Sequence, residues 1–149
     1  MAKNTILQSL NDSDNVADLN SSNRRQVQTF IAGAAIAAGD AVALDLSESN
    51  DSDKALKVVK CDTAAQFIFV GVALEAASAA GDSIRICISG LCECKVDSSC
   101  AANSLLIASV SGGKLVHSVD KKAAQLCAIG TEAKGSETLA TVFVIRQGY

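Results

Sequence analysis

The chain contains no proline and no tryptophan, and it has only one tyrosine and one histidine in 149 residues. Average proline usage of about 5% would give roughly seven prolines, so the turns have to be made by Gly, Asp, Asn and Ser. Large aromatic anchors are also scarce, because Phe, Tyr and Trp together number five while alanine numbers 25. A core of Val, Ile, Leu and Ala packs in thin layers, which favours a small barrel or sandwich.

The chain also lacks excess positive charge and long apolar runs. Its net charge is −3 and its pI is near 5.0, whereas nucleic-acid binding needs clustered Lys and Arg; the one adjacent arginine pair is Arg24 and Arg25. No apolar run reaches the length of about 18 residues that a membrane span needs, and the start Met1–Gln8 lacks the apolar core of a signal peptide. We therefore expect cytosolic folding with six reduced cysteines, and neither a nucleic-acid nor a membrane partner.

What the sequence does contain is a repeated unit, in which a small-residue run and Gly-Asp precede an alternating apolar strand. The two copies are Ala37–Leu44 and Ala79–Ile86. Gly accepts positive φ and Asp can accept a hydrogen bond from its own backbone two residues on, so each Gly-Asp predicts a turn. A chain built from such units is expected to be an all-β shell of short strands.

Two segments of different character follow from this pattern. Residues 1–26 are rich in Asn, Asp and Ser, which fill 12 of these positions, and they are interpreted as an extended N-terminal arm that becomes ordered against a partner; a frayed terminus is the alternative. Residues 27–149 are predicted to form one compact β-barrel or sandwich of about nine or ten short strands. The expected strands are Val27–Ile31, Ala41–Leu46, Ala55–Lys60, Phe67–Leu74, Ser83–Ser89, Leu91–Val96, Leu105–Val110, Lys114–Val119, Leu126–Thr131 and Leu139–Arg146.

Glycines mark special points in this pattern. Gly71 lies in the strongest apolar run and predicts a bulge or a close approach in a strand buried on both sides. Gly90 is expected to break its strand, and Gly112-Gly113 predicts the turn of a hairpin. Helix is expected only near Thr63–Gln66 and Ala76–Ala80, and the acidic stretch Ser47–Asp53 is expected to be a solvated loop.

The cysteines are the first candidates for chemistry, because Cys92 and Cys94 form a C-x-C pair with Cys87 and Cys100 nearby. Four thiolates can close a zinc site, but zinc ribbons usually place two residues between paired cysteines. In an alternating strand Cys92 and Cys94 point to the same face, so we favour packed structural cysteines and keep a metal site or a disulfide as the alternative.

Other candidate sites are weaker. His117, the sole histidine, shares a strand face with Leu115 and no nucleophile can be assigned to it. The stretch Ser111–Lys114 resembles half a P-loop, but a strand rather than a helix follows it, and the acidic loop Glu48–Asp53 lacks the frame of a calcium site. We therefore expect no enzyme activity, no cofactor and no metal.

The order of motifs along the chain resembles a known protein group. A polar arm leads to "A-G-D-A-V" (Ala38–Val42), "F-V-G-V-A-L" (Phe69–Leu74) and "A-G-D-S-I-R-I-C-I-S-G" (Ala80–Gly90), and then to "A-I-G-T-E-A" (Ala128–Ala133) and a last strand "A-T-V-F-V-I-R" (Ala140–Arg146). Over residues 27–147 this order resembles the small capsid decoration, or cement, proteins of tailed bacteriophages, a family formerly of unknown function.

This resemblance implies a compact β-barrel, commonly a homotrimer, that is assembled in the host cytoplasm. Such a trimer binds the major capsid protein on the outer capsid surface of an expanded head and stabilises the contacts between capsomers. The arm would lie on the capsid shell, and three modest contacts per trimer would add up to high avidity. From charge alone, Arg24 and Arg25 are the expected capsid-contact residues of the arm. The six cysteines depart from the family as we know it.

Two other classes of function remain as alternatives. One is a host- or glycan-binding module of a head fibre, although sugar platforms usually need exposed aromatic rings. The other is an enzyme, or a carrier barrel of the lipoyl or biotinyl type, for which Lys121 and Lys122 in Asp120–Ala123 are the only candidates.

Overall fold

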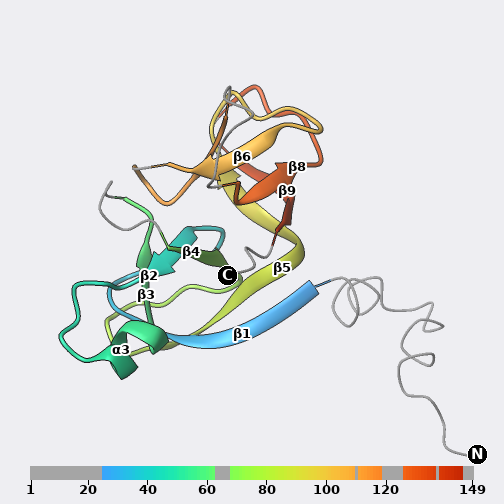
Figure 1. Cartoon of the computed structure of the whole chain (residues 1–149). Helices are drawn as coiled ribbons and strands as arrows, with labels where there is room; N and C mark the ends of the chain where they lie inside the picture. Colours follow the sequence, from blue (N-terminus) through green and yellow to red (C-terminus); the bar gives the residue numbers. More distant parts are fainter. Residues whose placement is uncertain (1–24, 63–67, 110, 119–125, 137, 146–149) are drawn as a thin grey trace, which may run out of the picture.

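The computed structural model describes residues 25–62, 68–109, 111–118, 126–136 and 138–145 of the chain. These residues form an almost entirely β fold of nine strands and one short helix, which confirms the predicted all-β class (Figure 1). The elements are β1 (Arg25–Ala32), β2 (Ala41–Leu44), α3 (Asp51–Leu56), β3 (Lys57–Lys60), β4 (Phe69–Ala73), β5 (Ser83–Val96), β6 (Leu105–Ala108), β7 (Leu115–His117), β8 (Ala128–Gly130) and β9 (Thr138–Val144).

The strands close into two small rings that share β5. The first ring runs β1-β3-β2-β4-β5 and returns to β1, and we call it the N-terminal barrel. The second runs β5-β7-β6-β8-β9 and returns to β5, and we call it the C-terminal barrel. Figure 1 shows the two barrels as separate lobes with β5 passing from one to the other. Among the described strands each one has a partner on both sides, so neither ring leaves an open sheet edge.

The long strand β5 serves both barrels because it bends at Gly90. At this residue β5 changes its antiparallel partner, from β1 through the pair Arg25–Gly90 to β9 through the pair Gly90–Val144. The φ of Gly90 is +101°, a backbone conformation that residues with a Cβ atom strongly disfavour. The expected break is therefore a bend, and hydrogen bonding continues on both sides of it.

The bend also changes which side chains face which core. Before it, Ile84 and Ile86 point into the N-terminal barrel, and Ile88 packs against the same cluster, as the alternation predicts. After it, Cys92 and Cys94 point into the C-terminal barrel, so the prediction that they share one face is confirmed.

The two cores meet at strands that are buried on both faces. Val42 of β2 packs in the N-terminal barrel, while its neighbours Ala41 and Ala43 pack in the cluster of the C-terminal barrel. In β4, Val72 packs in the cluster of the C-terminal barrel and Ala73 packs in that of the N-terminal barrel. Small residues suit these positions, because a strand between two cores has to bring its neighbours close on each side.

Gly71 confirms the expected close approach. A Cβ on Gly71 would collide with the backbone carbonyl of Cys87 in the adjacent strand β5. The register between β2 and β4 also shifts here, since Val42 pairs with Gly71 but Ala43 pairs with Phe69, which leaves one extra residue in β4. The bulge and the close approach expected at this glycine are both present.

The two Gly-Asp units form matching turns that bind each other's strands. Gly39 and Gly81 have φ of +83° and +93°. The backbone of Gly39-Asp40 exchanges two hydrogen bonds with Ala73 at the end of β4, and that of Gly81-Asp82 exchanges two with Ala32 at the end of β1. The first unit is thus hydrogen-bonded to β4, the strand that precedes the second unit, and the second unit is hydrogen-bonded to β1, the strand that precedes the first.

The aspartates in these turns bond in a direction opposite to the expected one. The Asp40 carboxylate accepts from the N–H of Ala37 at 2.8 Å, and the Asp82 carboxylate accepts from the N–H of Ala79 at 2.9 Å, three residues earlier in both cases. The turn lies before the aspartate, so the nearby free N–H groups lie there too.

Some predicted elements are corrected. The acidic loop contains the helix α3, and the strand expected from Ala55 begins at Lys57. No helix forms over Ala76–Ala80, where the backbone follows turns and bridges to Ile36. The predicted hairpin is confirmed, since β6 and β7 are antiparallel around Gly112 and Gly113, both with positive φ. The candidate helix Thr63–Gln66 lies outside the described residues.

The domain boundary expected at residues 26 and 27 falls within β1, which begins at Arg25. Residues 1–24 of the predicted arm lie outside the described part of the chain. In the described part, no helix has the length and apolar character of a membrane span.

Candidate functional site

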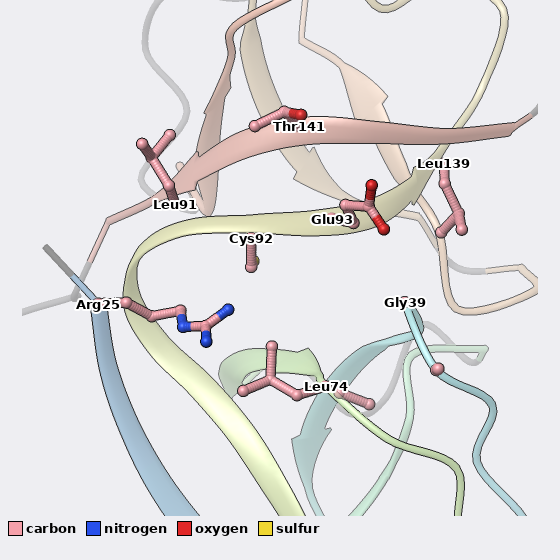
Figure 2. Close-up of a pocket in the computed structure, with 10 residues that line it drawn as sticks. Arg25, Gly39, Leu74, Leu91, Cys92, Glu93, Leu139 and Thr141 are labelled. Carbon is pink, nitrogen blue, oxygen red and sulfur yellow. The ribbon is translucent and has the colours of Figure 1, made fainter. Parts of the chain in front are cut away.

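A cleft of about 530 Å³ lies between the two barrels, on one side of the bend in β5. Its walls come from the start of β1, the first Gly-Asp turn, the end of β4, and the parts of β5 and β9 that follow the bend (Figure 2). The lining residues are Arg25, Ala38, Gly39, Ala73, Leu74, Leu91, Cys92, Glu93, Leu139 and Thr141. The cleft thus combines one guanidinium, one carboxylate and one thiol with leucine side chains.

Arg25 lies at one end of this cleft, and its side chain points into it (Figure 2). Its backbone pairs with Gly90, which places the guanidinium beside the bend of β5. The Nε atom is buried and has no hydrogen-bond partner within the described part of the chain. A buried donor without a partner costs free energy, so Arg25 retains an unused capacity to bind an anion or a carbonyl oxygen.

Two thiols lie next to Arg25. Cys87 and Cys92 stand on either side of Gly90, and their side chains are hydrogen-bonded to each other. The hydrogen bond from Cys92, with help from the positive charge of Arg25, lowers the pKa of the Cys87 thiol, and the same hydrogen bond together with burial raises the pKa of Cys92. Within the pair, the thiolate form is therefore favoured more at Cys87 than at Cys92.

A second surface feature is a row of apolar side chains across the outside of the C-terminal barrel. Leu91 pairs with Phe143, Phe143 with Ile129, and Ile129 with Leu105, so the row crosses four neighbouring strands. Phe143 is 42% exposed, and the other three are partly exposed. We call these four residues the outer apolar row. Directly paired side chains of this kind form a continuous contact surface.

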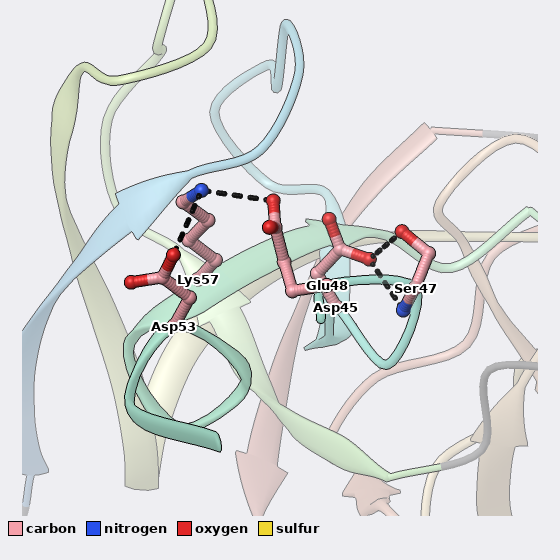
Figure 3. A network of polar contacts seen from close by, with 5 residues as sticks. All are labelled: Asp45, Ser47, Glu48, Asp53 and Lys57. Atoms are coloured by element: carbon pink, nitrogen blue, oxygen red, sulfur yellow. Dashed lines mark hydrogen bonds and ion pairs between the residues drawn. The ribbon is translucent and has the colours of Figure 1, made fainter. Parts of the chain in front are cut away.

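The acidic loop uses its carboxylates within the protein. Lys57 Nζ lies 2.8 Å from Glu48 Oε1 and 3.7 Å from Asp53 Oδ2, and Asp45 accepts two hydrogen bonds from Ser47 (Figure 3). The hydrogen bond to Glu48 raises the pKa of Lys57. This ion-pair network holds α3 onto β3 and gives the carboxylates a structural role.

Of the predicted site residues, the structure brings together Cys87, Cys92 and Arg25 but groups none of them into a metal site. All six cysteines are free and buried, and within the described ranges no three or more His, Cys, Asp or Glu side chains are grouped so as to hold a metal ion. His117 is exposed at the end of β7, and Ser111–Lys114 is the turn of a hairpin. Of the predicted arm contacts, Arg25 lies in β1 and lines the cleft, while Arg24 lies outside the described residues, as do Lys121 and Lys122.

The sequence did not predict the cleft or the outer apolar row. Arg25 and Cys92 are distant in sequence, and only the closure of the N-terminal barrel brings them together. The row had a signal, because Phe143 has the opposite phase to the buried Val142 and Val144, which marks an outward apolar side chain.

Comparison with known proteins gives a likeness of fold. No protein-family model and no curated protein sequence matches the chain. Among solved structures, the fold is similar to the head fibre gp8.5 N base of bacteriophage phi29, with a TM-score of 0.55 and 14% sequence identity. The match covers 84% of this chain and 98% of that chain. At this identity the likeness establishes a shared fold.

Proposed function

We propose that this chain is a structural protein of a bacteriophage virion, and more specifically a capsid decoration protein on the outside of an expanded head. The observation that carries the proposal is the fold likeness to a phage head-fibre base, which extends over 98% of that structure. The order of sequence motifs, which resembles that of phage cement proteins, independently supports the same class.

In this proposal the protein acts by bridging subunits of the major capsid protein. A homotrimer would make three equivalent contacts, and the linked contacts would hold each trimer far more tightly than one contact does. The N-terminal arm, up to Arg24 and the start of β1 at Arg25, would lie along the capsid shell. The bridged capsomers would then resist the outward pressure of packaged DNA.

The closed barrels restrict how the copies can meet. Without an open edge in the described sheet, strand addition between barrels is disfavoured, so contact has to use side-chain surfaces. The outer apolar row supplies such a surface, and Phe143 at its centre exposes 42% of its area. We assign this row to the contact between neighbouring copies of the chain.

A second candidate function is the base of a head fibre that carries a host- or glycan-binding module. The likeness to the head fibre gp8.5 N base favours this possibility as much as it favours a virion protein in general. The two functions differ in their consequence for the head. A decoration protein saturates many positions and raises the temperature at which heads release DNA, whereas a fibre base attaches without that stabilisation.

The test starts with the mass of the reduced protein by light scattering, followed by co-sedimentation with expanded and unexpanded heads. We expect a mass of about three chains and binding to expanded heads only. Phe143→Asp should lower both the mass and the binding. Leu56→Asp is the matched control, since Leu56 is 49% exposed on α3, away from the row.

The result that would overturn the proposal is equally direct. Failure of the parent protein to co-sediment with expanded heads would exclude the decoration function. Binding without a higher DNA-release temperature would select the fibre base. An unchanged mass for Phe143→Asp, with native circular dichroism, would remove the row from the contact between copies.

A further inference from the structure

The structure brings two thiols and a guanidinium together at the bend that joins the barrels. Cys87 lies just before Gly90 and Cys92 just after it, and both side chains belong to the core cluster of the C-terminal barrel. The Cys87 Sγ also lies 3.5 Å from the carbonyl oxygen of Ser89 and 4.0 Å from that of Gly90, so it is turned toward the bend. Each of the two thiols is the largest influence on the pKa of the other, which places their interaction at this bend.

The pair is buried but has an opening to solvent. Cys92 is 5% exposed and lines the cleft, where Figure 2 shows its side chain on the same side of β5 as that of Arg25. Cys87 is fully buried behind it. A small solute that enters the cleft therefore meets Cys92 and Arg25 first, and Cys87 lies on the other side of Gly90 from Cys92.

The surroundings stabilise negative charge at this point. The Arg25 Nε is buried and has no partner among the residues that the structure describes, which points independently to an anion at the bend. Its positive charge favours the thiolate form of both cysteines, and Cys92 donates to the Cys87 sulfur. Thiolates, rather than thiols, are the form that reacts with oxidants, so Cys87, the one cysteine of the six whose pKa is lowered, is the most reactive of them.

We propose that Cys87 and Cys92 form a redox-active dithiol, which closes to a disulfide across the Gly90 bend when hydrogen peroxide enters the cleft between the barrels. This inference concerns a modification site and does not depend on the proposed virion function.

The reaction balances with peroxide as the oxidant. The Cys87 thiolate attacks one peroxide oxygen, the O–O bond breaks, and the departing hydroxide takes the proton of Cys92 and leaves as water. The Cys92 thiolate then attacks the sulfur of the Cys87 sulfenic acid, which forms the S–S bond and breaks the S–O bond. The second hydroxide takes up the proton that Cys87 had released. Two thiols and one peroxide thus give one disulfide and two waters.

The consequence of closure is mechanical. The disulfide would tie together the two halves of β5 on either side of Gly90, where the strand changes partner from β1 to β9. The angle between the N-terminal and C-terminal barrels would then be fixed by a covalent bond as well as by packing.

The experiment treats the reduced full-length protein with hydrogen peroxide, blocks remaining thiols in denaturant and measures intact and tryptic masses. Cys87, Cys92 and Cys94 all fall in one tryptic peptide, Ile86–Lys95. We expect this peptide to lose two hydrogen atoms and to carry a single blocking group, on Cys94. Arg25→Met should slow closure severalfold, because it removes the positive charge that favours the Cys87 thiolate.

Two serine variants provide the contrast. Cys94→Ser alters a fully buried cysteine on the same face and should still close. Cys92→Ser should not lose two hydrogen atoms, and its Cys87 sulfenic acid should be captured by dimedone. Circular dichroism checks that each variant folds, and Cys92→Ala replaces the serine variant if it does not. Blocking groups on both Cys87 and Cys92 of the treated parent, or failure of Cys94→Ser to close, would overturn the proposal.

Discussion

Lys95 Nζ lies 2.5 Å from Asp40 Oδ1 and links the C-terminal half of β5 to the turn that precedes β2. The Asp40 side chain is 3% exposed and that of Lys95 39%, so the carboxylate is buried and the ammonium reaches it from the surface. The backbone repeats the link, since the N–H of Lys95 donates to the carbonyl oxygen of Gly39 at 2.8 Å. This first Gly-Asp unit therefore joins the two barrels.

Removing the cation should destabilise the protein. Lys95→Met removes the ammonium partner of a buried carboxylate, which also accepts from the N–H of Ala37, and we expect the free energy of unfolding to fall by about 1–3 kcal/mol. Urea titration measures this change. Asp40→Ala tests the carboxylate of the same pair, and Asp82→Ala is its matched control. Asp82 occupies the same place in the second unit, but it bonds Ser78 and Ala79 at the surface. Asp40→Ala should lower the free energy of unfolding more than Asp82→Ala, and equal decreases would contradict a joining role for Asp40.

Gly71 allows a second prediction, about the contact between β4 and β5. A methyl group at this position meets backbone atoms of Cys87, which cannot move aside without breaking the ladder. We expect Gly71→Ala to reduce the free energy of unfolding by about 3 kcal/mol or more. Gly135→Ala is the control, because its Cβ would meet nothing within 4 Å and it should be nearly neutral. A native thermal midpoint for Gly71→Ala would show that the strands are less tightly packed than described.

Local features of this fold were predictable because each depends on neighbouring residues. The Gly-Asp turns, the Gly112-Gly113 hairpin and the close approach at Gly71 follow from backbone rules that act over a few residues. The helix α3 was missed for the converse reason. None of its residues is buried, so it has no apolar periodicity to reveal it.

The closure of two rings could not be predicted from the same rules. Gly90 signals an interruption, but only the pairing of β5 with β1 and then with β9 turns that interruption into a joint between barrels. The cleft follows from this joint, since closure of the N-terminal barrel pairs Arg25 with Gly90, close to Cys92, and closure of the C-terminal barrel adds the wall from β9. Long-range pairing leaves little trace in a single sequence, which is why the architecture was recognised as β but not as two barrels.

A third prediction concerns stability in alkali. Burial raises the pKa of Cys61 to about 12 and that of Cys127 to about 11, from a usual value of 9.0. Below pH 9 these thiols are neutral in both the folded and the unfolded chain, so their ionisation does not lower the free energy of unfolding there. As the pH rises above 9 the unfolded chain releases these protons and the folded chain does not. Stability should then fall by about 1.4 kcal/mol per pH unit for each thiol, up to pH 11–12.

The measurement is the free energy of unfolding in urea at pH 8 and pH 10, with a reductant present. Cys127→Ala removes one of these two thiols. The decrease in the free energy of unfolding with pH should then be smaller by the contribution of one thiol, while the stability at pH 8 changes only through packing. A slope that is the same in both proteins would mean that Cys127 is not shielded from solvent.

The last prediction concerns the two arginines at the end of the arm. If they anchor the arm on an acidic capsid surface, Arg24→Ala/Arg25→Ala should bind expanded heads about fivefold to tenfold more weakly, because exposed ion pairs contribute up to about 1 kcal/mol each. The loss should shrink at high salt, where these charges are screened. Arg24→Lys/Arg25→Lys keeps both charges and should retain most of the binding. Arg25→Ala alone separates the roles, since the cleft residue also faces Cys87 and Cys92. A double variant that binds heads as well as the parent would leave Arg25 a role in the cleft alone.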